Sequence, residues 1–151
     1  MNVFIFRLFF ALCSSFVMTI SVYAQENQLL GRWRMLDDST GNPKASILIY
    51  ESRGGIEGKI DKLLQEGAEK ANPRCEKCEG ALKNQAFLGL VILSGLSQSA
   101  PDKWRGRILD PENGKTYDAI VTPIAGGEKL DVHGYIGIQL FGRRQVWQRE
   151  H

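Results

Sequence analysis

Residues 104–121 read WRGRILDPENGKTYDAIV, which is two alternating runs on either side of a strong turn. The alternating positions that form one face are Trp104, Gly106, Ile108, Tyr117, Ala119 and Val121. Between the runs, residues 110–114 combine a proline that presets the turn with an Asn-Gly pair that tolerates positive φ. The segment therefore predicts an antiparallel β-hairpin with one buried face.

The same period-two runs and glycine-rich turns recur on both sides of this hairpin. The predicted strands lie near residues 31–37, 44–51, 55–61, 89–95, 103–109, 115–123, 129–136 and 143–149. About eight such strands are typical of an antiparallel meander, and that number can close into a barrel that holds side chains or one small ligand. We therefore predict one all-β domain, an antiparallel meander β-barrel, over residues 25–151.

Residues 61–85 interrupt the alternation with a charged stretch rich in lysine and glutamate. We predict a long loop insertion, which could also serve as a surface for a protein partner. It contains Cys75 and Cys78, and turn-forming residues surround the pair rather than a strand and a helix. This context favours a structural disulfide over a redox-active pair, and a zinc site would need more ligands than the neighbourhood offers.

The N-terminus has the features of a cleavable signal peptide, residues 1–24. Arg7 precedes an apolar stretch of about 15 residues, which is short for a membrane span, and Val22-Tyr23-Ala24 resembles a cleavage site. Cleavage would leave 127 of the 151 residues with a net charge of +1, because Arg7 is the only charge removed from a precursor of +2. We expect export across the inner membrane to a bacterial periplasm, and no membrane span in the mature chain.

Aromatic and polar residues of the first and last strands are the best candidates for a binding site. In a closed meander these strands are neighbours, so Arg149 can lie over Trp33, which follows Gly31-Arg32 on the first strand, in a stabilising cation–π contact. Arg143 and Gln145 alternate with Trp147 and form a polar-aromatic face. The predicted ligand-binding residues of the barrel interior are Trp33, Trp104, Tyr117, Arg143, Gln145 and Trp147.

No catalytic constellation stands out in the sequence. His133 is more simply explained as a surface or hydrogen-bonded strand histidine than as a general base, and the carboxylates are scattered among strand ends and polar faces. Basic residues form no stripe of the kind that nucleic acids bind. The sequence therefore predicts no cofactor, no metal and no nucleic-acid partner.

Several segments together resemble a family of secreted bacterial proteins catalogued as domain of unknown function 2147. The matching segments are residues 31–33, 56–60, 88–96, 104–117, 130–137 and 142–149. Gly31-x-Trp33, the meander and the arginine of the closing strand also resemble the lipocalin and calycin pattern. This resemblance implies an exported lipocalin-like barrel and no particular activity.

We therefore expect a binding module for a small apolar or amphipathic ligand, or an envelope-associated protein. Two alternatives stay open: a periplasmic thiol-disulfide or hydrolytic enzyme, and an interaction module that uses the 61–85 loop.

Overall fold

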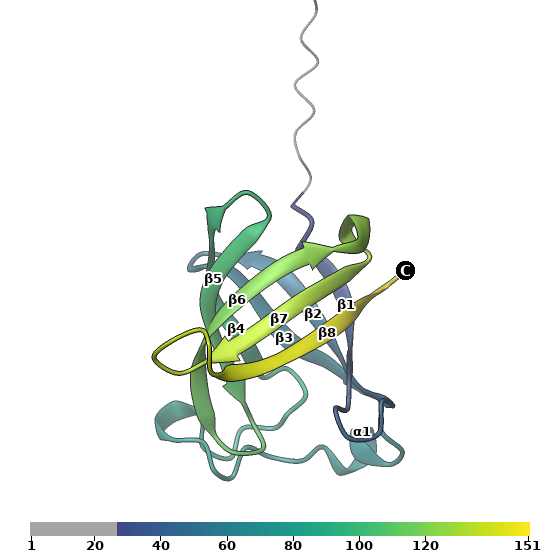
Figure 1. Ribbon diagram of the computed structural model, residues 1–151. Coiled ribbons are helices and arrows are strands. Elements are labelled where there is room, and N and C mark those ends of the chain that lie inside the picture. The colour runs from purple at the N-terminus through teal and green to yellow at the C-terminus, as the bar shows by residue number, and fades with distance from the viewer. Residues whose placement is uncertain (1–26) are drawn as a thin grey trace, which may run out of the picture.

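The computed structural model describes residues 27–151, which form a closed antiparallel β-barrel (Figure 1). Each strand pairs with the next in the chain, and the last pairs with the first. The strands are β1 (Gly31–Leu36), β2 (Pro43–Ser52), β3 (Gly55–Leu63), β4 (Val91–Ala100), β5 (Lys103–Asp110), β6 (Lys115–Ile124), β7 (Lys129–Tyr135) and β8 (Gly142–Glu150). The all-β barrel predicted from the sequence is confirmed, whereas the predicted signal peptide, residues 1–24, lies outside the described residues.

The β5–β6 hairpin forms as its sequence predicts. The two strands pair over seven residues without a register shift. At the turn, the Gly114 amide donates to the Asp110 carbonyl (2.8 Å), and the Asp110 carboxylate accepts from the Glu112 amide (2.9 Å). Gly114 has φ +76°, a conformation that glycine adopts without the steric cost of a side chain. Local turn chemistry therefore sets the register of this hairpin.

Strand β4 is longer than predicted, because it continues past Gly95 to Ala100. Gly95 has φ +60° and lies in a register shift of the β4–β5 pairing, between Ser94 and Ser97. A bulge with a glycine at positive φ lets a strand bend and resume pairing, so the glycine marks a bend here and not an end.

The connections alternate between the two ends of the barrel, as an antiparallel meander requires. One end carries residues 37–42, 64–90, 111–114 and 136–141. The insertion, residues 64–90, holds helix α1 (Ala68–Ala71) and a single 3₁₀ turn (Gly80–Leu82), and it lies at the bottom of Figure 1. The other end carries the described N-terminal residues and the three remaining connections.

The barrel interior is filled mainly by large apolar side chains. Trp33 and Trp147 are fully buried, and Trp104 is 6% exposed. They belong to one continuous cluster of buried residues to which every strand contributes. The other face of β8 turns toward solvent. Of the helices in residues 27–151, none has the length and apolar character needed to cross a bilayer.

Candidate functional site

A cavity of about 400 Å³ lies inside the barrel, and every strand contributes to its wall. This volume falls within the range of small-molecule sites, about 300–1,000 Å³. Much of its wall is apolar and includes Met35, Ala45, Ile60, Ile92, Ile108 and Val132. The cavity is therefore large enough and apolar enough to enclose the hydrocarbon part of a small molecule.

The cavity opens at the end of the barrel that carries the insertion, which we call the open end. Glu112, Ile136, Phe141 and Arg143 line the cavity and are also exposed to solvent. By contrast, Ile60, Ile92 and Val132 on its wall are almost completely buried, so the apolar part of the wall is the inner part. A ligand would thus enter past a rim that carries both charged and apolar side chains and reach an apolar interior.

Arg143 is held at this rim by two carboxylates, one from the 37–42 connection and one from the end of β5. Its Nε donates to Asp38 Oδ2, and its Nη1 lies 3.8 Å from Asp110 Oδ2. Gln145 Nε2 also donates to Asp38, at 2.8 Å. Burial by itself would raise the pKa of Asp38, but the hydrogen bonds from Arg143 and Gln145 outweigh it and lower that pKa below its ordinary value. Arg143 and Gln145 thus stabilise the ionised form of Asp38 at the rim.

A second set of polar side chains completes the rim. Lys44 Nζ forms an ion pair with Glu112 Oε1 at 2.7 Å. Asn113 Nδ2 donates both to Asp110 Oδ2 (2.9 Å) and to the Tyr117 hydroxyl oxygen (3.0 Å). The Tyr117 hydroxyl proton has no acceptor among the described residues, so it can be donated to a ligand.

Three of the six residues that the sequence nominated for ligand binding line the cavity, namely Tyr117, Arg143 and Gln145. The three tryptophans, Trp33, Trp104 and Trp147, lie instead in the packed core. On β8 the inward positions run from Arg149 through Trp147 and Gln145 to Arg143, so Trp147 sits one step deeper than the wall of the cavity. The structure therefore places the tryptophans where they fill the barrel and leaves the polar residues at its mouth.

Arg149 links β8 to residues 28–30 and to the β6–β7 connection, on the side opposite the open end. Its guanidinium lies 4.1 Å from the centroid of the Trp33 ring, in the cation–π arrangement that the sequence predicted. It also donates to three backbone carbonyls, those of Gln28 (2.6 Å), Leu30 (3.1 Å) and Gly127 (2.7 Å). These contacts close this end of the barrel.

Gly31 makes room for that arginine. It has φ +121°, and a Cβ at this position would lie 3.1 Å from Arg149 Nη1. Glycine is therefore needed here for both backbone conformation and close approach.

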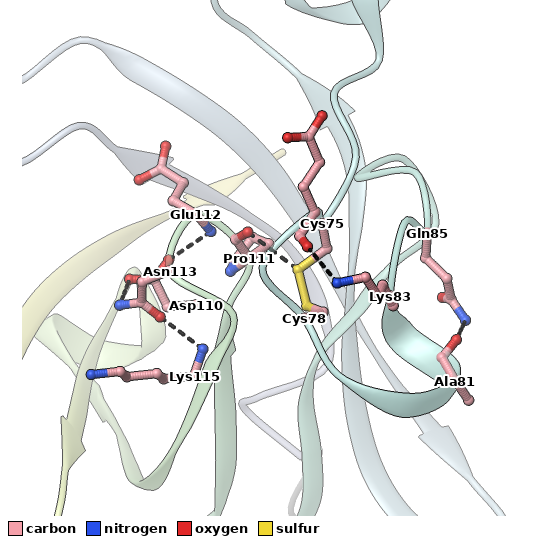
Figure 2. Close-up of a disulfide and its surroundings, with 11 residues drawn as sticks. Cys75, Cys78, Ala81, Lys83, Gln85, Asp110, Pro111, Glu112, Asn113 and Lys115 are labelled. Carbon is pink, nitrogen blue, oxygen red and sulfur yellow. Dashed lines mark hydrogen bonds between the residues drawn. A yellow bond between two sulfur atoms is a disulfide. The ribbon is translucent and has the colours of Figure 1, made fainter.

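The Cys75–Cys78 disulfide closes a four-residue loop within the insertion, and this loop lies against the β5–β6 turn (Figure 2). Cys75 Sγ lies 3.2 Å from the Pro111 carbonyl oxygen, and a side chain at Gly114 would collide with the Lys77 carbonyl. Both cysteines are buried, although a thiol–disulfide catalyst needs a sulfur that its partner can reach. The geometry favours a structural role, in which the disulfide braces one side of the cavity rim.

His133 and Asp131 lie on the outer face of β7, away from the cavity. The His133 ring packs 5.5 Å from the Tyr135 ring, and its Nδ1 lies 3.5 Å from Arg144 Nη2. Asp131 pairs with Arg144 at 2.7 Å. These are the contacts of a packed strand surface, in keeping with the simpler interpretation of His133.

Several rim residues were not predicted from the sequence, among them Asp38, Lys44, Phe87, Ile136 and Phe141. For the last two a signal was present, because residues 136–141 (IGIQLF) are strongly apolar although they form a connection. Their exposed side chains stand beside the cavity mouth. The other three lie in or beside connections whose positions depend on tertiary structure.

Residues 31–149 match the model of the family described as "Uncharacterized protein conserved in bacteria (DUF2147)". No curated protein matches the chain significantly. Among solved structures, the chain is similar to the one titled "Protein HP1028 from the human pathogen Helicobacter pylori belongs to the lipocalin family". The TM-score is 0.69 and the identity 18%, over 82% of this chain and 83% of that chain. At this identity the similarity shows the fold. The chain belongs to the DUF2147 family, and its fold is a lipocalin-like β-barrel.

Proposed function

We propose that this protein binds one small amphipathic molecule inside its barrel. The observation that carries the proposal is the cavity of about 400 Å³, whose inner wall is apolar and whose mouth carries charged side chains. Eight-stranded barrels of the lipocalin type are wide enough to hold one small ligand. Each methylene group buried in such a wall contributes about 0.8 kcal/mol, so a medium-length alkyl chain supplies enough energy for binding.

Filling the cavity should strongly weaken ligand binding without unfolding the barrel. Val132 lines the cavity and is 2% exposed, so Val132→Phe would place the added ring atoms in the ligand space. We expect affinity for N-phenylnaphthylamine, an apolar dye that fluoresces in apolar sites, to fall by at least about tenfold, since the variant occupies the volume that the dye needs. Fluorescence titration gives the dissociation constant.

The matched control is Val146→Phe, which makes the same change on the outer face of β8, where Val146 is 44% exposed. This variant should bind the dye as the wild type does. Equal losses in both variants, or unchanged binding in Val132→Phe with the fold intact by circular dichroism, would place the dye outside the cavity and contradict the proposal.

We also propose that the protein works outside the cytoplasm, in a bacterial periplasm. The charged and apolar segments of residues 1–24 support this proposal, and an oxidising compartment suits the Cys75–Cys78 disulfide. N-terminal sequencing of the protein from a periplasmic fraction should give a chain that starts at Gln25. Recovery of the intact precursor from the cytoplasm alone would contradict it.

A further inference from the structure

The rim of the cavity holds more negative than positive charge. Two cations line it, Lys44 and Arg143, and two carboxylates, Asp110 and Glu112. Asp38 adds a third carboxylate through its hydrogen bond to Arg143. The five groups together have a net charge of −1.

Neither cation is free to receive an anionic ligand. Lys44 is engaged by Glu112 at 2.7 Å, and Arg143 by Asp38, with Asp110 at 3.8 Å. An incoming carboxylate would have to displace Asp38 from Arg143 and would still face Asp110 and Glu112. Like charges at such distances repel, and the exchange of one carboxylate for another on Arg143 gains little.

A cationic head group meets the opposite situation. An ammonium at the mouth can approach Asp110, whose only cationic partner in the described ion pairs is the distant Arg143 Nη1. It can also approach Glu112, which pairs with Lys44 through Oε1 but whose side chain is 55% exposed. The wall below these groups is apolar, so the alkyl part of the same molecule would lie against Ile92 and Val132.

From this arrangement we infer that the cavity selects amphipathic ligands by head-group charge, in the order alkylammonium, then uncharged, then carboxylate. The inference rests on the proposed function, since it assumes that the cavity holds an alkyl chain. It adds the chemical class of the ligand, an aliphatic amine, which the apolar wall alone does not specify.

The test compares decylamine, decanol and decanoate as competitors of N-phenylnaphthylamine at neutral pH and low ionic strength. The three ligands share one alkyl chain and differ in head group. We expect decylamine to bind about tenfold more tightly than decanoate, with decanol between them, and the difference to shrink as salt screens the rim charges.

Asp38→Asn should narrow the difference in affinity between decylamine and decanoate. The substitution removes the negative charge that neutralises Arg143, and asparagine still offers an oxygen to accept the hydrogen bond from Arg143. We expect decanoate affinity to rise about fivefold in this variant. Asp102→Asn is the matched control: it removes the same charge from the β4–β5 connection at the opposite end, and Asn tolerates the φ of +54° there. The control should retain the wild-type order.

If the three ligands displace the dye equally well, or decanoate does so best, the head-group inference is wrong and the proposed function stands. If Asp102→Asn shifts the order as much as Asp38→Asn, the preference does not come from the rim, and the inference also fails. If neither the dye nor any competitor binds, the proposed function itself is overturned, and the inference falls with it.

Discussion

The free energy of unfolding should fall by about 3–5 kcal/mol when Trp33 is replaced by alanine. Trp33 is fully buried, and its indole N–H donates to the Leu29 carbonyl at 2.8 Å. Its removal leaves a cavity among packed side chains, an unpaired carbonyl, and Arg149 without the ring against which it lies. Chemical denaturation followed by tryptophan fluorescence and circular dichroism measures the change.

Trp33→Phe separates the contribution of the indole hydrogen bond from the contribution of apolar packing. It keeps most of the apolar volume and an aromatic face for Arg149, but it loses the indole N–H. We expect a smaller loss, about 1–2 kcal/mol, because one buried hydrogen bond is broken and little space is created. Equal stability of Trp33→Ala and the wild type would show that Trp33 does not support the packing described for this end of the barrel.

Arg149→Met should destabilise the barrel by about 2–4 kcal/mol, although it replaces a charged side chain by an apolar one of similar length. The guanidinium donates to three carbonyls from two separate segments and lies over the Trp33 ring. Methionine can pack against the ring but donates to none of the three carbonyls. The loss should be seen in the same denaturation experiment as a lower midpoint with an unchanged slope.

Arg32→Met provides the comparison for a charged residue on the neighbouring strand. Arg32 pairs with Asp61 at 2.9 Å, and about half of its side chain is exposed. An exposed ion pair contributes about 0–1 kcal/mol, so this variant should unfold almost as the wild type does. If both variants lost a similar free energy of unfolding, the effect would come from removing an arginine charge in general and not from the contacts that Arg149 makes.

The strands and their order were predictable because local signals agree along most of the chain. Alternation with period two predicts strands, and residues 110–114 predict a turn whose backbone hydrogen bond, from the Gly114 amide to the Asp110 carbonyl, is made within the turn itself. Gly95 shows the limit of such signals. A glycine inside an apolar run indicates either an end or a bulge, and only its pairing with β5 decides between them.

Depth along the barrel was not predictable for the aromatic residues. Trp147, Gln145 and Arg143 share one face of β8, so alternation assigns all three to the interior alike. Whether an inward residue fills the core or lines a cavity depends on its neighbours across the barrel, which belong to strands far away in the sequence. For this reason the ligand-binding residues predicted from the sequence include three tryptophans that the structure places in the core.

The charged rim could not be predicted from the sequence for a related reason. Asp38 and Arg143 are separated by 105 residues, and they meet because β1 and β8 are adjacent and the 37–42 connection reaches the mouth. In the sequence, Asp37 and Asp38 are two adjacent carboxylates near the end of the first predicted strand, and nothing local distinguishes them. Asp37 does accept from the amides of Ser39 (3.0 Å) and Thr40 (2.9 Å), and hydrogen bonds from these two residues lower its pKa to about 2. Asp38 points instead to Arg143 and Gln145.

The most direct test of the account is to locate a bound alkyl chain by NMR. With decylamine added to protein whose isoleucine and valine methyl groups are labelled, we predict intermolecular NOEs from the chain to Ile60, Ile92 and Val132, which line the cavity. NOEs confined to Val146 or to Ile138, which are exposed on the outside, would show adsorption to the surface and would contradict a ligand site inside the barrel.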